Sequence, residues 1–535
     1  MKKTMLKALC LITAALMLAA VIPFTAFAKT APETRDIWDG SVAGSFAGGS
    51  GTAEDPYLIS SGAELAYLAE QVNAGEGYDG CFFEMTQDIC LNDTEGWEDW
   101  SPENAPANMW IPVGGTFVYN EAGFPIPCQF CGSFNGNGYT VSGAYFYTNG
   151  DLHTHPVGGV FGRVRGEVTD LNVRDSKFID EDSGTPLGAV VAYAMSGTVR
   201  NCTSNSIVIG TDTASGIVGV LAYDGGRVEN CINTGSVSGW LHVGGIVGNG
   251  NGLIENCRNE GSIGQIAEQG GIPWAYGGIA GYFAFGTIRN CTNTGSVSAN
   301  ASGIGGIVGT SDDGAGELLT IECCCNEGSI SGGGAVGGII GWDGDSYTNI
   351  ENCYNRGALS GEMNIGGLVG TCYAFGTCAY VNCYNAGAVS GTENVHPFIG
   401  RNVYEDHQPN VENCYYLDTC CEAGDEYAEA LTDEQLRLED SYEGFDFETV
   451  WTMDGDPDYP YAELTGQAPA QLLPGDVDGD GEVTVADALL ALRASMGLIE
   501  LDNAQWAAAN VDGDEEVTVA DALLILRASM GLLEL

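Results

Sequence analysis

The sequence predicts a mainly β protein built around a parallel β-helix, that is, a β-solenoid of repeats rich in Gly, Asn and Cys, followed by a small α-helical module. Two observations predict the solenoid: an Asn-Cys phrase returns every 26 to 34 residues, and a Gly-Gly-Ile-Val-Gly phrase runs in step with it. Each repeat of roughly 30 residues contains about three short β-branched stretches, which are too short for helices and are typical of strands. Such a unit buries its apolar side only by stacking on its neighbours.

The cysteines show the period most clearly. Each is the last residue of a phrase such as Val228-Glu229-Asn230-Cys231, and the aligned set is Cys202, Cys231, Cys257, Cys291, Cys324, Cys353, Cys383 and Cys414. Stacked coils would align them as an internal ladder, with the neighbouring Asn residues as a hydrogen-bonded turn ladder. Because buried Cys behaves as a small hydrophobe, we expect core packing. Disulfides between adjacent coils and metal binding are the alternatives.

Five glycine phrases run in step with the cysteines. They occupy residues 244–248, 277–281, 305–309, 337–341 and 366–370, and Asn-x-Gly phrases begin at Asn233, Asn293 and Asn385. They resemble the GLUG repeats of bacterial surface and secreted proteins, over about 158–418. The resemblance implies a β-solenoid with a passive or adhesive role and no fixed catalytic residues.

Length and charge exclude several classes of function. The 535 residues are too many for one ordinary domain, and 72 Asp and Glu against 18 Lys and Arg give a formal net charge of −54. So acidic a surface repels phosphate backbones and anionic bilayers, which bind proteins through Lys and Arg. We therefore expect no nucleic-acid partner and no binding to membrane surfaces.

Residues 1–28 have the pattern of a secretory signal peptide: lysines, then an apolar run from Ala8 to Phe24, then Ala26-Phe27-Ala28. No later apolar run is long enough to span a bilayer. We expect a secreted, extracellular protein without membrane insertion after signal cleavage.

Flanking segments should cap the solenoid, because an uncovered end presents unpaired strand edges. Residues 29–157 are expected to form the N-terminal cap and first coils, with an amphipathic helix from Ser61 to Asn73. Residues 419–464 are expected to form a C-terminal cap with a short helix from Thr432 to Glu439. Residues 465–473 would then be a linker.

The strongest chemical signal follows the linker, where alternate oxygen-bearing residues on a tight loop recur 34 residues apart. The two sets of ligands are Asp476, Asp478, Asp480, Glu482, Thr484 and Asp487, then Asn510, Asp512, Asp514, Glu516, Thr518 and Asp521. A hard cation wants six to eight oxygens, so each loop predicts one calcium ion, two in all. Glu515 stands where the second loop should have Gly, so that loop is expected to bind calcium more weakly.

These paired loop–helix units, with Asp at position 12 and no entering helix, resemble type I dockerin modules over 474–535. The resemblance implies docking onto a cohesin of a scaffoldin in a cellulosome-type assembly. The positions that match the family's recognition residues are Val485, Ala486, Leu492, Arg493, Val519, Ala520, Leu526 and Arg527. Because both halves present the same residues, binding in two orientations is expected.

Aromatic and acidic residues follow several Gly-Gly phrases and should stack along one edge of the solenoid. The candidate glycan-binding residues are Tyr223, Tyr282, Phe285, Trp342 and Tyr373, accompanied by Asp224, Phe283, Asp343, Asp345 and Phe375. Ring faces suit the apolar faces of pyranoses, and acids suit hydroxyls. Core or turn packing and calcium binding are the alternatives.

Catalytic signals on the solenoid are weak. Asp312 and Asp313 are the candidate catalytic pair, with a solvated turn as the alternative, and no Gly-His-Gly accompanies them. Cys128 and Cys131 could bind zinc together with His153 and His155, or could be packed or disulfide-linked.

The sequence therefore leaves three classes of function open. The first, which we favour, is a secreted cellulosome-type component whose solenoid is a non-catalytic module that binds plant or host polysaccharide or acts as a spacer. The second is a divergent β-helix O-glycosyl hydrolase or polysaccharide lyase in polysaccharide catabolism. The third is an adhesin-like, protein-binding solenoid.

Overall fold

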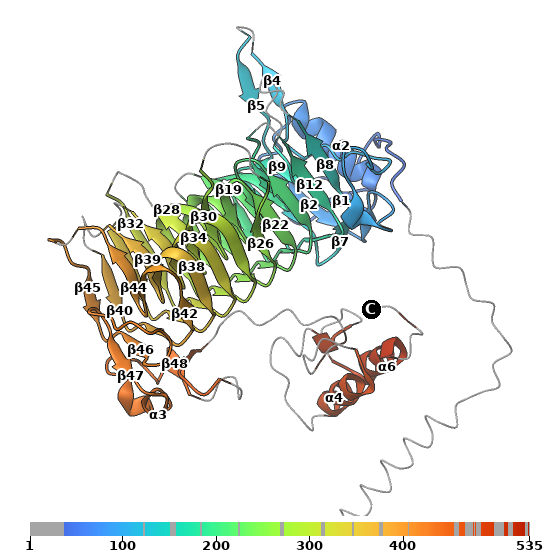
Figure 1. Ribbon diagram of the computed structural model, residues 1–535. Coiled ribbons are helices and arrows are strands. Elements are labelled where there is room, and N and C mark those ends of the chain that lie inside the picture. The colour runs from blue at the N-terminus through green and yellow to red at the C-terminus, as the bar shows by residue number, and fades with distance from the viewer. Residues whose placement is uncertain are drawn as a thin grey trace, which may run out of the picture. The chain divides into compact units, whose positions relative to one another are not determined.

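The computed structural model describes residues 37–465 apart from 121–122, 150–156, 182–183, 223–224, 268–271, 312–315, 345–346, 374–377, 405 and 454–458, and beyond them residues 475, 477, 483–496, 508–511, 517–529 and 533. Within these residues the chain is mainly β, and successive coils stack into a solenoid whose strands pair in parallel (Figure 1). The predicted parallel β-helix is confirmed.

Three sheets form the walls of the solenoid. The first contains β1 (Tyr57–Ile59), β2 (Phe82–Met85), β6 (Ser133–Asn135), β9 (Phe161–Val164), β10 (Glu167–Thr169), β14 (Val191–Met195), β15 (Thr198–Arg200), β19 (Val218–Ala222), β20 (Arg227–Glu229), β24 (Val247–Glu255), β28 (Ala280–Arg289), β31 (Val308–Ser311), β32 (Leu318–Glu322), β35 (Ile340–Asp343), β36 (Tyr347–Glu351), β39 (Val369–Cys372), β40 (Ala379–Val381), β44 (Ile399–Asn402) and β45 (Asn410–Glu412).

The second sheet contains β3 (Ile89–Cys90), β7 (Thr140–Ser142), β11 (Asn172–Arg174), β16 (Thr203–Ser204), β21 (Ile232–Asn233), β25 (Arg258–Asn259), β29 (Thr292–Asn293), β33 (Cys325–Asn326), β37 (Tyr354–Asn355), β41 (Tyr384–Asn385), β46 (Tyr415–Leu417) and β47 (Glu429–Leu431). The third contains β8 (Tyr145–Thr148), β12 (Lys177–Asp180), β13 (Leu187–Gly188), β17 (Ile207–Gly210), β18 (Ala214–Ser215), β22 (Ser236–Gly239), β23 (Leu241–Gly244), β26 (Ile263–Gln265), β27 (Trp274–Gly277), β30 (Val297–Gly305), β34 (Ile330–Gly337), β38 (Leu359–Gly366), β42 (Val389–Ser390) and β43 (Glu393–His396). Two antiparallel pairs lie outside these sheets, β4 (Phe117–Tyr119) with β5 (Pro125–Pro127) and β48 (Trp451–Thr452) with β49 (Glu463–Leu464).

The cysteine ladder is confirmed. The eight aligned cysteines are buried in the hydrophobic core, and none of the eighteen described cysteines forms a disulfide bond. Burial raises the pKa of Cys202, Cys231, Cys257 and Cys291 well above the ordinary thiol value. These four thiols therefore stay protonated and pack as small hydrophobes.

The outer turn ladder is confirmed as well. Asn230 has a left-handed φ of 53°, a conformation that Asn tolerates, and its amide donates to Asn201 Oδ1 at 3.0 Å. Asn256, Asn290, Asn382 and Asn413 repeat this arrangement, and in the degenerate copy Cys323 takes the left-handed position instead.

A second, fully buried Asn ladder explains why the glycine phrases accompany the Asn-x-Gly phrases. Asn293 Nδ2 donates to Asn326 Oδ1 at 2.7 Å and to Gly295 O at 2.9 Å, and Asn293 Oδ1 accepts from Asn259 at 2.8 Å. A Cβ added to Gly278 would collide with the Asn293 side chain. The second glycine of the phrase is therefore required by the buried amide beside it.

One helix lies near the start of the solenoid's chain, and another follows its last coils. The predicted N-terminal helix is confirmed as α2 (Gly62–Asn73), which is capped by Ser61 and contributes Leu65, Leu68 and Val72 to the core. The second predicted helix is shorter than expected: α3 covers only Asp433–Leu436, and η2 (Glu439–Ser441) follows as a 3₁₀ turn.

The segment after β47 also covers the side of the last coils. Tyr354, Tyr384 and Tyr415 form an aromatic column on the second sheet, and Trp451 and Phe445 pack in the same buried cluster. Arg356 adds ion pairs to Glu327 and Glu463, the second of which joins the solenoid to this segment. This side packing arises because the column changes from Thr292 and Cys325 to tyrosine in these coils.

The C-terminal module contains α4 (Val485–Ser495) and α6 (Val519–Ser529). The two helices share a small core that includes Val477, Ala491 and Ile525. No helix among the described residues is long and apolar enough to cross a membrane.

Candidate functional site

Four aromatic side chains form a continuous row over the coils of β27, β35, β39 and β44. The ring centroids of Trp274 and Trp342 are 5.9 Å apart, those of Trp342 and Tyr373 are 5.1 Å apart with planes inclined by 22°, and those of Tyr373 and Tyr404 are 5.8 Å apart. We call Trp274, Trp342, Tyr373 and Tyr404 the aromatic row. Trp274 is 38% exposed and Tyr404 37%.

The row lies over two threonines that would otherwise face solvent. Thr310 and Thr371 are in register with Trp342 on either side of it, and both are buried. Trp274 Nε1 donates to Thr310 Oγ1 at 2.7 Å, which fixes the indole across the neighbouring coils. Gly303, at φ 73°, leaves room for this indole, because a Cβ there would collide with Thr310 and Trp274.

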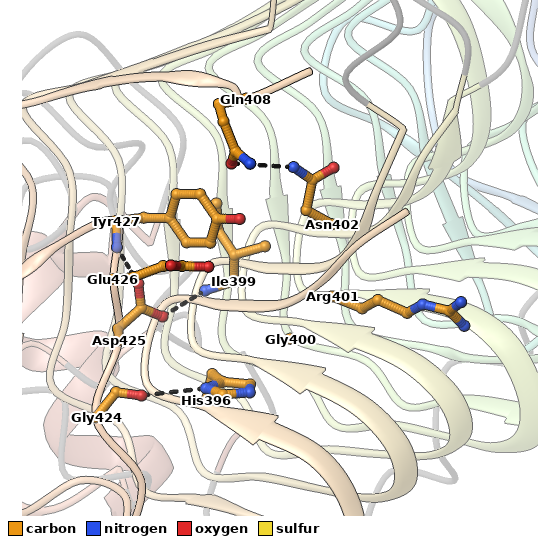
Figure 2. Close-up of a pocket in the computed structure, with 10 residues that line it drawn as sticks. All are labelled: His396, Ile399, Gly400, Arg401, Asn402, Gln408, Gly424, Asp425, Glu426 and Tyr427. Carbon is orange, nitrogen blue, oxygen red and sulfur yellow. Dashed lines mark hydrogen bonds between the residues drawn. The ribbon is translucent and has the colours of Figure 1, made fainter. Parts of the chain in front are cut away.

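A polar cavity of about 480 Å³ lies next to the end of the row. Figure 2 shows Tyr427, Glu426, Asn402 and Gln408 around it. Asn402 connects the two features, since its Oδ1 accepts from the Tyr404 backbone N–H at 3.3 Å and its Nδ2 donates to Gln408 Oε1 at 3.2 Å. Row and cavity thus form one surface with ring faces at one end and amide, hydroxyl and carboxylate groups at the other.

The carboxylate of Asp425 is occupied by hydrogen bonds to the backbone. Its Oδ2 accepts from the backbone N–H groups of Phe398 and Ile399 at 3.2 and 3.1 Å, and its Oδ1 accepts from those of Tyr427 and Ala428 at 2.7 and 3.3 Å. Figure 2 shows the bonds to Ile399 and Tyr427. Burial raises the pKa of Asp425, and the backbone donors oppose that effect. Of the two acids that line the cavity, only the exposed Glu426 is therefore available to a ligand as a carboxylate.

The structure brings together two of the five predicted glycan-binding residues, Trp342 and Tyr373. Tyr282 lies in the same register column, with its ring 5.5 Å from that of His242, and Phe285 is half-buried on β28. Tyr223 lies outside the described residues.

The acidic and aromatic residues predicted to accompany this set are either buried or outside the described residues. The expectation that Asp343 and Phe283 lie on the outer edge is wrong, because both are fully buried. Successive strand residues face opposite sides, so an outward Trp342 places Asp343 inside. Asp224, Asp345, Phe375 and the candidate catalytic pair Asp312 and Asp313 lie outside the described residues.

Sequence reasoning missed Trp274, Tyr404 and the cavity. Trp274 comes shortly before a Gly-Gly phrase instead of after it, and Tyr404 follows Pro397-Phe398-Ile399-Gly400, a degenerate copy of that phrase. Extending the repeat to this copy would have found Tyr404.

Of the residues proposed for zinc, the structure describes Cys128 and Cys131, and their thiols hydrogen-bond to different backbone carbonyls. Cys128 Sγ donates to Asn73 O at 3.3 Å, and Cys131 Sγ donates to Gln129 O at 3.9 Å. Both are free thiols, which is the packing alternative, and His153 and His155 lie outside the described residues.

In the C-terminal module, Asp487 and Asp521 occupy equivalent buried positions. Asp487 accepts from Val477 N at 2.8 Å and from Thr484 N and Oγ1 at 2.8 and 3.0 Å, and Asp521 accepts from Thr518 N and Oγ1 at 2.7 and 3.0 Å. These buried oxygens suit a hard cation such as calcium. Asn510 is also described, whereas Asp476, Asp478, Asp480, Glu482, Asp512, Asp514, Glu515 and Glu516 lie outside the described residues.

The two helices of the module present matching side chains to solvent. Val485 and Val519 are 61% and 52% exposed, and Arg493, Arg527 and Ala520 are exposed as well. Leu492 and Leu526 are half-buried against the core of the module. Leu489 and Leu523, which sequence reasoning did not single out, are exposed beside the valines.

Comparisons with known proteins agree with this architecture. Residues 474–528 match the Dockerin type I domain, and residues 273–298 match the GLUG motif. The chain is thus a β-solenoid protein with a GLUG motif and a C-terminal type I dockerin domain. Dockerin domains of this type generally bind calcium and dock onto cohesins of scaffoldins in extracellular cellulosomes.

Similarity to whole proteins is partial. The chain is 29% identical over 203 residues to halomucin of Haloquadratum walsbyi, covering 37% of this chain and 2% of halomucin. It is 31% identical over 145 residues to a protein of Evansella cellulosilytica that is named as a Gly-rich membrane protein, covering 27% of this chain and 14% of that protein. A solved structure from Bacteroides ovatus, described as an immunoglobulin A1 protease, aligns with 79% of this chain and 98% of its own at 18% identity and a TM-score of 0.37.

Proposed function

We propose that this protein is a secreted component of a cellulosome-type assembly whose solenoid binds polysaccharide without cleaving it. Its dockerin would bind two calcium ions and dock onto a scaffoldin cohesin, through the exposed residues of α4 and α6. The aromatic row and the adjacent cavity would bind the polysaccharide.

The observation that supports glycan binding is the continuity of the aromatic row with the polar cavity. Aromatic faces stack on the apolar faces of pyranose rings, while Glu426, Tyr427 and Gln408 offer hydrogen-bond partners for hydroxyls. The strongly acidic chain would repel uronic acids, so we propose a neutral polysaccharide as the ligand.

Affinity electrophoresis in gels containing xyloglucan, glucomannan, mixed-linkage glucan or arabinoxylan tests this proposal, with polygalacturonate as the acidic comparison. We expect retardation by at least one neutral polysaccharide and none by polygalacturonate. Trp342→Ala should weaken binding about tenfold, because it removes the central ring of the row. Tyr119→Ala, an exposed aromatic on β4, is the matched control and should bind like the wild type.

Reducing-sugar release from the same polysaccharides separates the alternative functions. No release is expected. Release by the wild type would overturn the non-catalytic assignment and favour a divergent hydrolase. Retardation by none of the polysaccharides would overturn glycan binding and favour the adhesin-like alternative.

Docking is tested separately, with a panel of type I cohesins and surface-bound full-length protein. We expect binding to at least one cohesin in calcium and its loss in EDTA. A double variant Val485→Asp and Val519→Asp should abolish binding, since it places charge on both copies of the apolar contact. Leu318→Asp, at an exposed leucine of the solenoid, is the control. Binding that survives both EDTA and the double variant would contradict the proposal.

A further inference from the structure

In the first sheet, residues in register on successive coils form columns, and one inward-facing column is aliphatic in all coils but one. The column runs through Val168, Val199, Val228, Ile254, Ile288, Ile321, Ile350, Tyr380 and Val411. Tyr380 alone in this column carries a polar group, and it is fully buried. A hydroxyl placed in such a core requires a partner, since an unpaired one costs about 1–3 kcal/mol.

The partners of Tyr380 come from a second inward column that also departs from the repeat. In earlier coils this column contains Val164, Ala194, Leu221, Gly250 and Phe283, and in later coils it contains Ser311, Asp343 and Cys372. Tyr380 Oη donates to Asp343 Oδ2 at 2.7 Å, and Cys372 Sγ lies 3.2 Å from the same hydroxyl. The residues that break the aliphatic pattern in the two columns are therefore in contact with one another.

A third residue that breaks the repeat, Cys378, lies beside Asp343 and Cys372. Cys378 lies outside the period of the cysteine ladder, and its thiol is within hydrogen-bonding reach of Asp343 and Cys372. The ligand atoms of Asp343, Cys372 and Cys378 all lie within 4.8 Å of one another, and the three residues are buried. Two sulfurs and one carboxylate oxygen at this spacing can occupy three corners of a tetrahedron around a cation with metal–ligand bonds of about 2.0–2.3 Å.

The environment of Asp343 also favours a cation. Its carboxylate accepts from the hydroxyls of Thr348 at 2.6 Å, Tyr380 at 2.7 Å and Ser311 at 3.3 Å. Among the described residues, none of its hydrogen-bond partners is a basic side chain. Buried carboxylates are normally paired with a positive charge or a metal.

We propose that Asp343, Cys372 and Cys378 bind a thiophilic divalent cation of the zinc class in the interior of the solenoid. Tyr380 supplies an oxygen as the fourth ligand or orients the carboxylate by its hydrogen bond, and Thr348 donates to the other carboxylate oxygen. Because the site is closed to solvent, the ion enters as the coils fold. Asp343 directly follows Trp342, and Cys372 directly precedes Tyr373, so the ion would cross-link the two coils that carry the centre of the aromatic row.

The test uses the full-length protein purified in calcium without chelators, its metal content, and its spectrum after replacement of the bound metal by cobalt. We expect about one thiophilic metal ion per chain, together with the thiolate-to-cobalt charge-transfer band and the strong visible bands of tetrahedral cobalt. The acidic calcium loops offer only oxygen ligands, so a thiolate band cannot arise from them, and the cysteine variants assign it. Cys372→Ser and Cys378→Ser should each lose the band, and Cys202→Ser, at a buried ladder position, should keep it.

Measurements on the wild type alone can overturn the proposal, whatever the variants do to folding. A protein that contains no thiophilic metal and gives no thiolate band with cobalt would contradict it. So would a non-reducing peptide map in which Cys372 and Cys378 are joined by a disulfide. A band that persists in both Cys372→Ser and Cys378→Ser would place the metal elsewhere.

Discussion

The inner and outer columns of the first sheet differ in how strictly they repeat. The inner column is aliphatic in every coil from Val168 to Val411 except at Tyr380. The outer column changes from coil to coil, through Arg163, Tyr193, Val220, Asn249, Tyr282, Thr310, Trp342, Thr371 and Arg401.

This difference distinguishes positions that stabilise the solenoid by packing from positions that are available for ligand binding. A position inside must match its neighbours one coil away, because stacking supplies most of each coil's burial. An outer position has no such constraint. Ligand sites are therefore expected at outer positions such as Trp342, and inside only where the repeat is broken, as at Asp343 and Tyr380.

Replacing a glycine of the Gly-Gly phrase should destabilise the solenoid more than any other change considered. In Gly278→Ala, the new Cβ would collide with the Gly306 carbonyl and with the buried Asn293 side chain. We expect the free energy of unfolding to fall by roughly 4 kcal/mol or more. Gly264→Ala, where a Cβ would meet nothing closer than 4.0 Å, is the matched control for thermal and denaturant unfolding. Equal stabilities of the two variants would contradict this account of the glycine phrase.

Removing one rung of the buried Asn ladder should have the next largest effect. Asn293→Ala leaves Asn259, Asn326 and the Gly295 carbonyl without their partner, which should lower the free energy of unfolding by about 2–4 kcal/mol. Asn300→Ala, at an exposed asparagine of β30, should change it by less than about 0.5 kcal/mol. A similar small change in both variants would show that the ladder does not stabilise the coils.

The buried thiols predict how stability depends on pH. In the folded protein, burial raises the pKa of Cys257 well above its ordinary value of 9.0, so above pH 9 only the unfolded chain loses this proton. Stability should therefore fall as pH rises above 9, and less steeply in Cys257→Ala than in the wild type. Melting temperatures measured from about pH 8 to about pH 10 check this. Identical slopes for both proteins would contradict a buried Cys257 that stays protonated in the folded protein.

The smallest effect is expected in the dockerin. Glu515→Gly should tighten calcium binding at the second loop several-fold, because the equivalent position of the first loop is Gly481 and glycine permits a tight bend. Calorimetric titration of the full-length protein measures both sites. Equal affinity of the second loop before and after the change would show that Glu515 is not what distinguishes the two loops.

Much of this architecture is visible in the sequence because a solenoid repeats its signals. The cysteine period predicted the ladder at Cys231, and i, i+3, i+4 spacing predicted the helix around Leu65. The contact between Gly278 and Asn293 was not predictable, because it joins two sides of one coil and depends on how the coil closes. Asp343 was misplaced for a related reason: a stack of post-glycine residues was expected on one edge, whereas strand alternation sends neighbours to opposite faces.

The most direct test replaces one residue on the outside of the solenoid and one in its interior. Melting temperature and polysaccharide affinity are measured for both variants. Trp342→Ala should lose about tenfold in affinity for the neutral polysaccharide that the wild type binds, with little change in melting temperature. Asn293→Ala should melt at a clearly lower temperature and bind like the wild type when assayed well below that temperature. The contrary result, a Trp342→Ala variant that melts early and still binds at full strength, would mean that the outer face is scaffold and that the binding surface lies elsewhere.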